Sequence, residues 1–195
     1  MSIRNEVSDS PTVEDQILDA ARSCVLDFGL RRTTLAEVAR RAGVSRPTVY
    51  RRWSDTRAVV ADLLTREIRL VIPAMDGAGP ARVQLVRAVV DVAAGMREHP
   101  LFVKILRSDP DLLMTYIVDR LGTSQRAIVD RVSLAVAAGQ ADGSIRPGEP
   151  THIAAMVLLI AQSAVQSAGM VAEVLPADQL TTELEIAVDN YLAPR

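Results

Sequence analysis

Apolar residues recur at helical spacing along most of the 195-residue chain. Positions i, i+3 and i+4 are repeatedly apolar, whereas few windows show the two-residue alternation of a half-buried strand. Gly, Pro and polar capping residues separate these patterns. Aromatic residues make up only 3% of the chain, and Ala, Leu and Val dominate. We therefore predict an all-α protein of about nine helices.

The first helix follows residues 1–11, a polar stretch that we expect to be a flexible leader. Thr12 and Asp15 have the spacing of a capping box, in which the hydroxyl accepts a backbone N–H of the first turn. Apolar side chains up to Phe28 then recur on one face, which we expect to be buried. Gly29 marks the end of this helix.

A helix, a tight turn and a second short helix come next. Thr34 and Glu37 have the spacing of another capping box, and the glycine after this helix can adopt a positive φ at the turn. Ser45 then caps a third helix, whose inward positions are Val49 and Trp53. The opposite face of this third helix is exposed, basic and carries one tyrosine.

A long helix begins after Ser54 or Asp55 and is predicted to continue to about Met75. We place the domain boundary inside this helix, because the charge balance changes near residue 57 without a flexible linker. The expected domains are therefore 12–57 and 58–195. Further helices are predicted at 81–98, 101–107, 109–141, 150–170 and 176–192.

The second and third helices carry a local excess of positive charge. Residues 31–57 contain eight arginines and two acidic residues, a net charge of +6, whereas the whole chain has a net charge of −2. The residues outside 31–57 therefore carry a net charge of −8. A local reversal of sign of this kind is what a nucleic-acid contact surface requires.

Other classes of protein lack their usual sequence signals here. His99 and His152 are far apart and have no metal-ligand spacing, so we interpret each as a capping or surface residue. There is no glycine-rich phosphate loop, GxSxG motif or Cys–His pair. The single cysteine, Cys24, excludes an internal disulfide and lies at an apolar helix position. We expect no enzyme, cofactor or metal and, without a signal segment, a cytoplasmic location.

The segment 153–172 contains twenty residues without a charge, which meets the length of a membrane-spanning helix. However, Gln162 and Gln166 lie four residues apart on one helix face, with two serines beside them. An apolar helix with a polar stripe is better explained by burial within the protein or between two subunits. We therefore expect no membrane contact.

The segment GVSRPTVYRRWSDTRAVV resembles the tetracycline-repressor (TetR) family of bacterial transcription regulators. The resemblance covers residues 12–64 and includes Gly29, Thr34, the AxxAGVS turn, the Thr-Val-Tyr helix and Trp53. It implies an N-terminal three-helix helix-turn-helix DNA-binding domain and a C-terminal helical domain for ligand binding and dimerisation. It also implies repression that a small molecule relieves.

The residue types of the third helix predict a division of DNA contacts. Arg46 has the planar fork that can bind guanine O6 and N7, Pro47 offers a rigid apolar contact, and Thr48 offers a methyl group to thymine. By the family resemblance, Thr34 and Tyr50 contact phosphates. The candidate DNA-binding residues are Thr34, Ser45, Arg46, Pro47, Thr48, Tyr50, Arg51, Arg52 and Arg57. Alternatively, individual arginines only solvate an exposed helix.

One position departs from the family pattern. The family often has a phosphate-contacting lysine three residues after the aromatic residue, and that position is Thr56 here. Arg57 follows, but a step of one residue turns a side chain by about 100° around a helix. The sequence leaves open whether Arg57 replaces this contact.

The resemblance also implies a homodimer and an effector pocket in the second domain. A two-fold dimer presents two recognition helices, one duplex turn apart, to a palindromic double-stranded operator. Candidate dimer-interface residues are Gln162, Gln166, Leu180, Leu184, Ala187 and Tyr191. Candidate pocket residues are Leu64, Ile68, Val89, Ala93, Met96, Phe102, Leu106, Leu113, Met114, Ile117, Leu121, Met156 and Ile160. Both patterns are also compatible with a purely intramolecular core.

Few aromatic residues lie between residues 54 and 190, so a flat ring-shaped ligand would find few stacking partners. Our hypothesis is a small hydrophobic, acyl-chain-like effector held by Leu, Val, Ile and Met side chains. The alternative function is a helix-turn-helix protein that acts without a ligand or as an activator.

Overall fold

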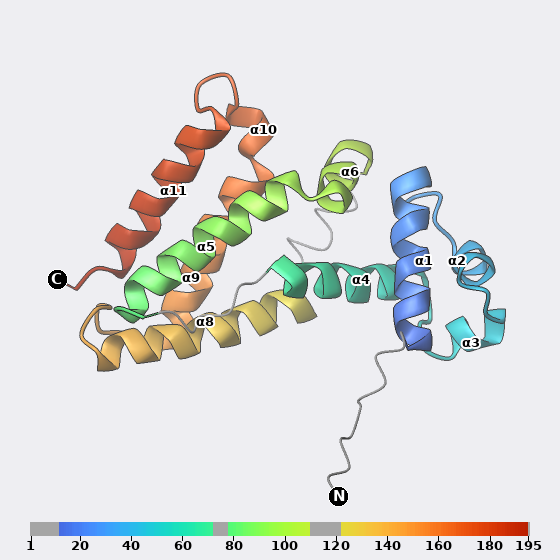
Figure 1. The fold of residues 1–195 in the computed structure, drawn as a ribbon, viewed down its shortest axis with the longest axis horizontal. Helices are drawn as coiled ribbons and strands as arrows, with labels where there is room; N and C mark the ends of the chain where they lie inside the picture. Colours follow the sequence, from blue (N-terminus) through green and yellow to red (C-terminus); the bar gives the residue numbers. More distant parts are fainter. Residues whose placement is uncertain (1–11, 72–77, 110–121, 195) are drawn as a thin grey trace, which may run out of the picture. The chain divides into compact units, whose positions relative to one another are not determined.

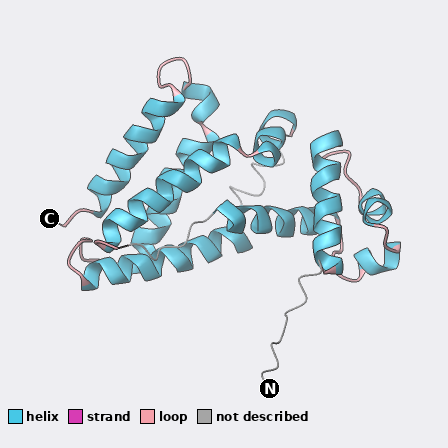
Figure 2. Cartoon of the chain, in the orientation of Figure 1, coloured by secondary structure: helices cyan, strands magenta, loops and turns pink. Residues whose placement is uncertain are grey.

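The computed structural model describes residues 12–71, 78–109 and 122–194. All regular secondary structure in these ranges is helical (Figures 1 and 2), which confirms the all-α prediction. The described ranges hold ten helices rather than about nine, because the expected 150–170 helix is interrupted at Ser167. The chain forms two compact units, Met1–Leu63 and Leu64–Arg195.

Three expectations concern residues outside the described ranges. These are the leader at 1–11, the continuation of the fourth helix towards Met75, and the part of the 109–141 helix that precedes Gly122. Within the described ranges, that last helix begins at Thr123, with Gly122 as its cap.

The described part of unit 1 contains three helices and the first half of a fourth. They are α1 (Val13–Phe28), α2 (Leu35–Ala42), α3 (Arg46–Tyr50) and α4 (Thr56–Val71). The first capping box is confirmed, because Asp15 N donates to Thr12 Oγ1 and Thr12 N donates to the Asp15 carboxylate, each at 3.1 Å. Gly29 ends α1 with a φ of 79°. At the start of α4, Asp55 provides the cap by accepting from Ala58 N at 2.9 Å.

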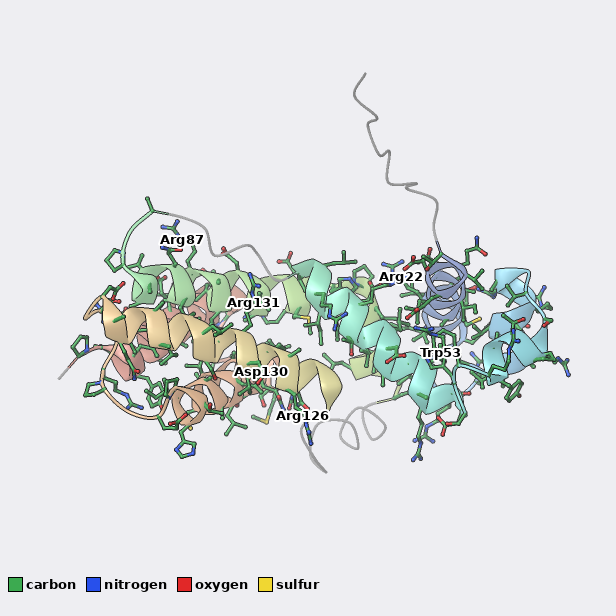
Figure 3. The ribbon with its side chains drawn as sticks, turned by 90° about the horizontal axis from the view of Figure 1, so that it is seen from below. Arg22, Trp53, Arg87, Arg126, Asp130 and Arg131 are labelled. Atoms are coloured by element: carbon green, nitrogen blue, oxygen red, sulfur yellow. The ribbon has the colours of Figure 1, made fainter. Side chains whose placement is uncertain are left out.

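An apolar core holds these helices together. Val49 is 0% exposed and Trp53 is 2% exposed, so both residues predicted to face inward are buried, although α3 ends at Tyr50 and Trp53 follows it. The indole N–H of Trp53 donates to Asp62 Oδ2 at 2.8 Å, which pairs the only polar atom of this side chain. Figure 3 labels Trp53 where the chain passes from α3 to α4. Cys24 is buried as expected, and burial raises the pKa of its thiol.

The expected burial of Phe28, at the end of α1, is wrong. We expected this side chain to be buried, but it is 37% exposed. The guanidinium of Arg41 lies 4.9 Å from the centre of its ring, and this position favours a cation–π interaction. Phe28 therefore contributes to the surface of unit 1, where a planar cation covers it.

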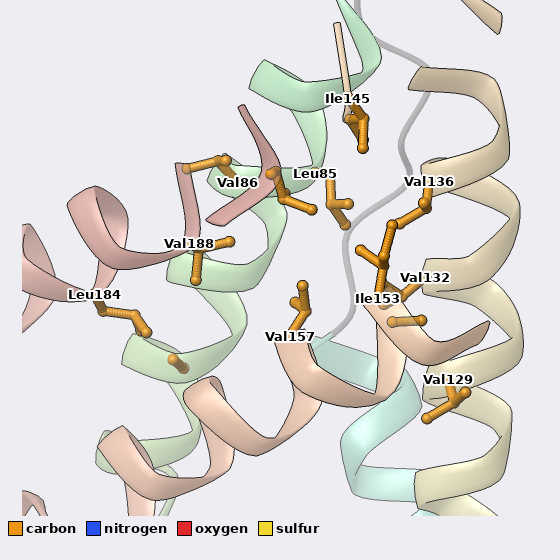
Figure 4. Close-up of a cluster of buried hydrophobic side chains, with 13 residues drawn as sticks. Leu85, Val86, Val129, Val132, Val136, Ile145, Ile153, Val157, Leu184 and Val188 are labelled. Carbon is orange, nitrogen blue, oxygen red and sulfur yellow. The ribbon is translucent and has the colours of Figure 1, made fainter. Parts of the chain in front are cut away.

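In the ranges that the structure describes, unit 2 contains the end of α4 and six further helices. They are α5 (Ala81–Glu98), α6 (Pro100–Ser108), α8 (Thr123–Ala141), α9 (Pro150–Gln166), α10 (Ala168–Val171) and α11 (Ala177–Leu192). Helix α9 packs against both α8 and α11, and α5 packs against all three. Figure 4 shows the resulting core, to which α5 contributes Leu85, α8 Val136, α9 Val157 and α11 Val188.

The loop between α8 and α9 contacts α8 and the end of α11. Ile145 N donates to Gly139 O at 2.8 Å, and a Cβ atom on Gly139 would collide with the Ile145 side chain. Arg146 Nε donates to Tyr191 O at 2.9 Å, and its guanidinium lies 4.5 Å from the centre of the Tyr191 ring. A small residue is therefore needed at position 139, and the end of α11 is held in place.

The uncharged segment 153–172 forms α9 and α10 and supplies Ile153 and Val157 to the core of unit 2. None of the helices in the described ranges combines the length and apolar character needed to cross a membrane.

Candidate nucleic-acid interface

The turn between α2 and α3 is set by local backbone chemistry. Gly43 ends α2 with φ 67° and ψ 23°, a left-handed conformation that glycine adopts without a steric penalty. Ser45 Oγ accepts from Thr48 N at 3.3 Å and so caps α3. Pro47 occupies the first turn, as predicted. Two short helices are thus joined by a turn of three residues, 43–45.

Glu37 does not form the second half of the predicted capping box. Thr34 Oγ1 does accept from Glu37 N at 3.2 Å. The Glu37 carboxylate, however, accepts two hydrogen bonds from Arg40, at 2.6 and 2.9 Å, and one from Arg41 at 3.4 Å. Charge-assisted bonds of this kind are stronger than one from a neutral amide. The hydrogen bond from Arg40 lowers the pKa of Glu37 to about 2, so this carboxyl stays ionised near neutral pH.

Arg41 joins α2 to α1. Its Nη1 donates to Ser23 Oγ at 2.5 Å and to Asp27 Oδ2 at 2.6 Å, and its side chain is only 19% exposed. Arg40 and Arg41 together therefore stabilise unit 1 itself. The local excess of +6 overstates the charge that is available to an external ligand.

Helix α3 presents a surface that we call the recognition face. It consists of Ser45, Arg46, Pro47, Thr48, Tyr50, Arg51 and Arg52. All of these side chains are exposed except Thr48, which is half-buried and whose hydroxyl lies 2.7 Å from Ser45 Oγ. Thr34 and Arg57, the two other candidate DNA-binding residues, are exposed as well.

The arginines of the recognition face differ in whether they have a partner. The guanidinium groups of Arg46 and Arg51 make no hydrogen bond or ion pair with any residue that the structure describes. Arg52, in contrast, forms an ion pair with Glu14 of α1, and its guanidinium lies 5.5 Å from the centre of the Trp53 ring. Arg46 and Arg51 are thus the cations of this face that are available to an anion.

A groove of about 340 Å³ lies beside the recognition face. It is lined by Val13, Glu14, Ile17, Thr48, Arg51 and Arg52. Residues of α1 therefore form one wall, and residues at and just after α3 form the other. Sequence reasoning missed Glu14, because only the packing of α1 brings this residue next to the recognition face.

The predicted pocket residues of the second domain differ in burial. Leu64, Ala93 and Phe102 are buried, and Ile68, Val89, Met96, Leu106 and Ile160 are half-buried. Met156 is a correction, because it is 42% exposed on α9 and therefore cannot line an enclosed pocket within this chain. The remaining candidates, Leu113, Met114, Ile117 and Leu121, lie outside the described residues.

Two of the predicted dimer-interface residues, Leu180 and Leu184, are buried within their own chain, which corrects these two positions. Leu184 belongs to the core of unit 2, and Leu180 is only 8% exposed. Gln162 Oε1 accepts from Gln125 Nε2 of α8 at 3.0 Å. Tyr191 is half-buried beside Arg146. Gln166 is half-buried, and Ala187 is exposed.

His99 lies between two helices, as the C-cap of α5 and the N-cap of α6, which agrees with the expected capping position, but its side chain is not at the surface. Its side chain is 17% exposed, and Nε2 lies 3.2 Å from Oε2 of Glu67, a residue of α4 whose side chain is 4% exposed. The imidazole also packs edge-on against the Phe102 ring, with the ring centres 5.3 Å apart. Its Nδ1 atom is buried and has no hydrogen-bond partner among the described residues. Within those residues, no cluster of three or more potential metal ligands occurs.

The arrangement of α1, α2 and α3 defines a helix-turn-helix unit. Helix α2 and the exposed helix α3 are joined by a short turn that contains glycine, and α2 packs on α1 while α3 packs on α2. This class of unit places its second helix in the major groove of DNA.

Comparisons with known proteins extend this classification. The model of the family described as bacterial regulatory proteins, tetR family, matches residues 17–63. An uncharacterized HTH-type transcriptional regulator of Mycobacterium bovis is 44% identical over 192 residues, covering 98% of this chain and 99% of the relative. The chain therefore belongs to the tetR family of bacterial transcriptional regulators, a family of DNA-binding proteins rather than enzymes.

Solved structures show the same fold. A putative TetR-family regulator from Rhodococcus sp. has a TM-score of 0.71 at 20% identity, covering 93% of this chain and 98% of that one. SmeT, the repressor of a Stenotrophomonas maltophilia multidrug efflux pump, has a TM-score of 0.61 at 22% identity, covering 91% and 87%. A SmeT–triclosan complex has a TM-score of 0.56 at 21% identity, covering 92% and 89%.

Proposed function

We propose that this regulator is a dimeric repressor that binds a palindromic operator and releases it when a small hydrophobic molecule binds. In this proposal, residues 12–57 form the DNA-binding domain and residues 58–195 form the ligand-binding and dimerisation domain. The protein acts in the cytoplasm. The observation that carries the proposal is the recognition face, whose Arg46 and Arg51 have no partner among the described residues. Exposed, unpaired guanidiniums are suited to guanine edges and phosphates.

The candidate residues divide into base and phosphate contacts. Arg46 lies in the first turn of α3, and recognition helices use their N-terminal residues to reach base edges. Pro47 and Thr48 add apolar contacts to bases, while Ser45 caps the helix. Tyr50 and Arg51 contact phosphates, with Thr34 doing the same from the start of α2. Arg57 is placed one position beyond the family's usual phosphate contact and takes over that role.

A binding-site selection with purified full-length protein tests this function. We expect a palindromic site whose half-sites are one helical turn apart, bound with an affinity that falls steeply as salt concentration rises. Each phosphate that the protein neutralises adds about −0.9 to the slope of log K against log salt. Selection of a site without two-fold symmetry would contradict the dimeric proposal, and an affinity independent of salt would contradict the role of the arginines.

The dimer interface is proposed to lie on α9 and α11, which pack against each other within the chain. Both helices expose apolar side chains that nothing in the described chain covers: Met156 and Leu159 of α9, 42% and 57% exposed, and Ile186 of α11, 47% exposed. Together with Ala187 they replace Leu180 and Leu184 as the contacts of the seam. Two copies of this pair of helices would form a four-helix bundle.

Leu159→Asp is expected to convert the dimer to a monomer. A buried leucine contributes about 1.5–3 kcal/mol, and a two-fold interface loses it twice, so the dissociation constant should rise by about 100-fold or more. Sedimentation velocity over a range of protein concentrations measures this change. Leu134→Asp, at a leucine of α8 that is 74% exposed, serves as the control and should leave the dimer intact. Equal behaviour of the two variants would place the seam elsewhere.

The effector is proposed to be small and largely aliphatic, held by the apolar side chains of the second domain. SmeT, whose structure is similar, has been solved in complex with triclosan, which supports a small-molecule effector for this regulator. Native mass spectrometry of purified protein, followed by adding the recovered molecule to the protein–operator complex, tests this role. Release of the operator supports a ligand-responsive repressor. A polar metabolite as the sole ligand would contradict the aliphatic assignment, and an affinity unaffected by any ligand would favour a ligand-independent protein.

A further inference from the structure

Glu14 is an acidic residue in a surface that is otherwise suited to DNA. It lies in the first turn of α1, lines the groove beside the recognition face, and forms an ion pair with Arg52. Arg51 and Thr48, both candidate DNA contacts, line the same groove. A carboxylate in this position repels phosphate, so its presence is unfavourable for DNA binding as such.

The start of α1 does not require Glu14. Thr12 and Asp15 already form the complete capping box, with hydrogen bonds of 3.1 Å in both directions. Acidic residues in the first turn also interact favourably with the helix dipole, but Asp15 supplies that interaction as well. The distinctive contact of Glu14 is therefore the one with Arg52.

Arg52 is held from two sides. Its guanidinium lies 5.5 Å from the centre of the Trp53 ring, and the Glu14 carboxylate pairs with it. The side chains of Arg52 and Glu14 remain 54% and 38% exposed, respectively. Exposed ion pairs of this kind contribute little to stability, so a well-placed phosphate can displace the carboxylate. A loosely bound duplex, whose phosphates are not fixed in register, does so less effectively.

We propose that Glu14 is a specificity-determining residue, which occupies Arg52 and thereby reduces binding to non-cognate DNA. This inference rests on the proposed DNA-binding role of the recognition face. Non-specific binding depends almost entirely on phosphate contacts, so withholding one cation per subunit weakens it most. At the cognate operator, the base contacts hold the duplex in register, and a fixed phosphate then replaces Glu14. A repulsive element of this kind raises discrimination at some cost in total affinity.

Glu14→Gln tests the proposal, measured on the selected operator and on a random-sequence duplex of equal length. We expect the affinity for random DNA to rise by about five- to tenfold near 0.1 M salt for each subunit that binds. The slope of log K against log salt should steepen by about 0.9 for each such subunit, because one more phosphate is neutralised. The affinity for the operator should rise less, so the ratio of the two affinities should fall.

Two further variants separate this mechanism from a general change in charge. Glu98→Gln removes the same charge from an exposed position at the end of α5, and it should leave both affinities unchanged. The double variant Glu14→Gln/Arg52→Gln should lose the gain in slope, because the released cation is absent. Melting curves monitored by circular dichroism check that α1 remains folded in each variant.

The outcomes are distinguishable. An unchanged salt slope in Glu14→Gln would overturn the inference, and so would a weaker affinity, which would mean that Glu14 positions Arg52 for DNA. Either result leaves the proposed function intact as long as the wild-type protein binds its operator in a salt-dependent way. Failure of the wild-type protein to bind any duplex would instead contradict both the proposed function and the inference.

Discussion

Arg46→Ala is expected to weaken binding to the selected operator by about 1–3 kcal/mol for each half-site, or about 5- to 150-fold. Arg46 is in the first turn of α3, exposed, and without a partner among the described residues, so its guanidinium can form two parallel hydrogen bonds with a guanine. Its removal should relax the base preference at one position of each half-site. Fluorescence anisotropy with the operator and with single-base variants measures both effects.

Tyr50→Phe provides the comparison for Arg46→Ala. Tyr50 is 52% exposed at the end of α3, and its hydroxyl is proposed to contact a phosphate. Removing this hydroxyl should therefore weaken binding to all sequences by a similar factor and leave the base preference unchanged. If both variants lost the same affinity on operator and on random DNA, the division into base and phosphate contacts would be wrong.

Trp53→Ala is expected to destabilise unit 1 by about 3–5 kcal/mol, which is the usual cost of removing a large aromatic side chain from a core. Trp53 is the largest of the fully buried side chains that the structure describes, and it follows α3 directly, with its backbone N–H donating to Val49 O at 3.0 Å. The cavity would remove the support of α3, so operator binding should be lost along with stability. Because Trp53 is the only tryptophan, urea denaturation must be followed by circular dichroism.

Trp53→Phe is the matched control for this second prediction. Phenylalanine keeps an aromatic ring in the core but loses the N–H group that donates to Asp62 at 2.8 Å. Its destabilisation should be clearly smaller than that of Trp53→Ala, and operator binding should persist. A stable Trp53→Ala variant that still binds DNA would show that α3 does not depend on this side chain.

The helices and caps of unit 1 could be predicted from the sequence because their determinants are local. The Thr12 capping box, the left-handed Gly43 and the Ser45 cap each involve residues within three positions of one another. Such contacts depend on the backbone of a single turn, which neighbouring residues largely dictate. Glu37 shows the limit of this reasoning, because two arginines compete successfully for its carboxylate.

The second domain was less predictable, because an amphipathic pattern identifies an apolar face without identifying what covers it. Leu180 and Leu184 have the spacing of a dimer seam, yet they pack inside their own chain. Ile186, two residues further along α11, is exposed instead. His99 lies beside the buried Glu67 of α4, and no local pattern in the sequence relates these two residues.

The sequence by itself determined the helical class of this protein, the helix-turn-helix with its caps, and the excess of arginine around it. Helical periodicity and capping arise from contacts within a few residues, so they can be read without the fold. Only the tertiary structure decided which arginines are already paired. Arg41 is bound to Asp27 and Arg52 to Glu14, because α1 packs against α2 and lines a groove together with residues at and just after α3. Charge pairing between distant residues depends on this packing, and within the described part of the chain it leaves Arg46 and Arg51 as the unpaired cations of the recognition face.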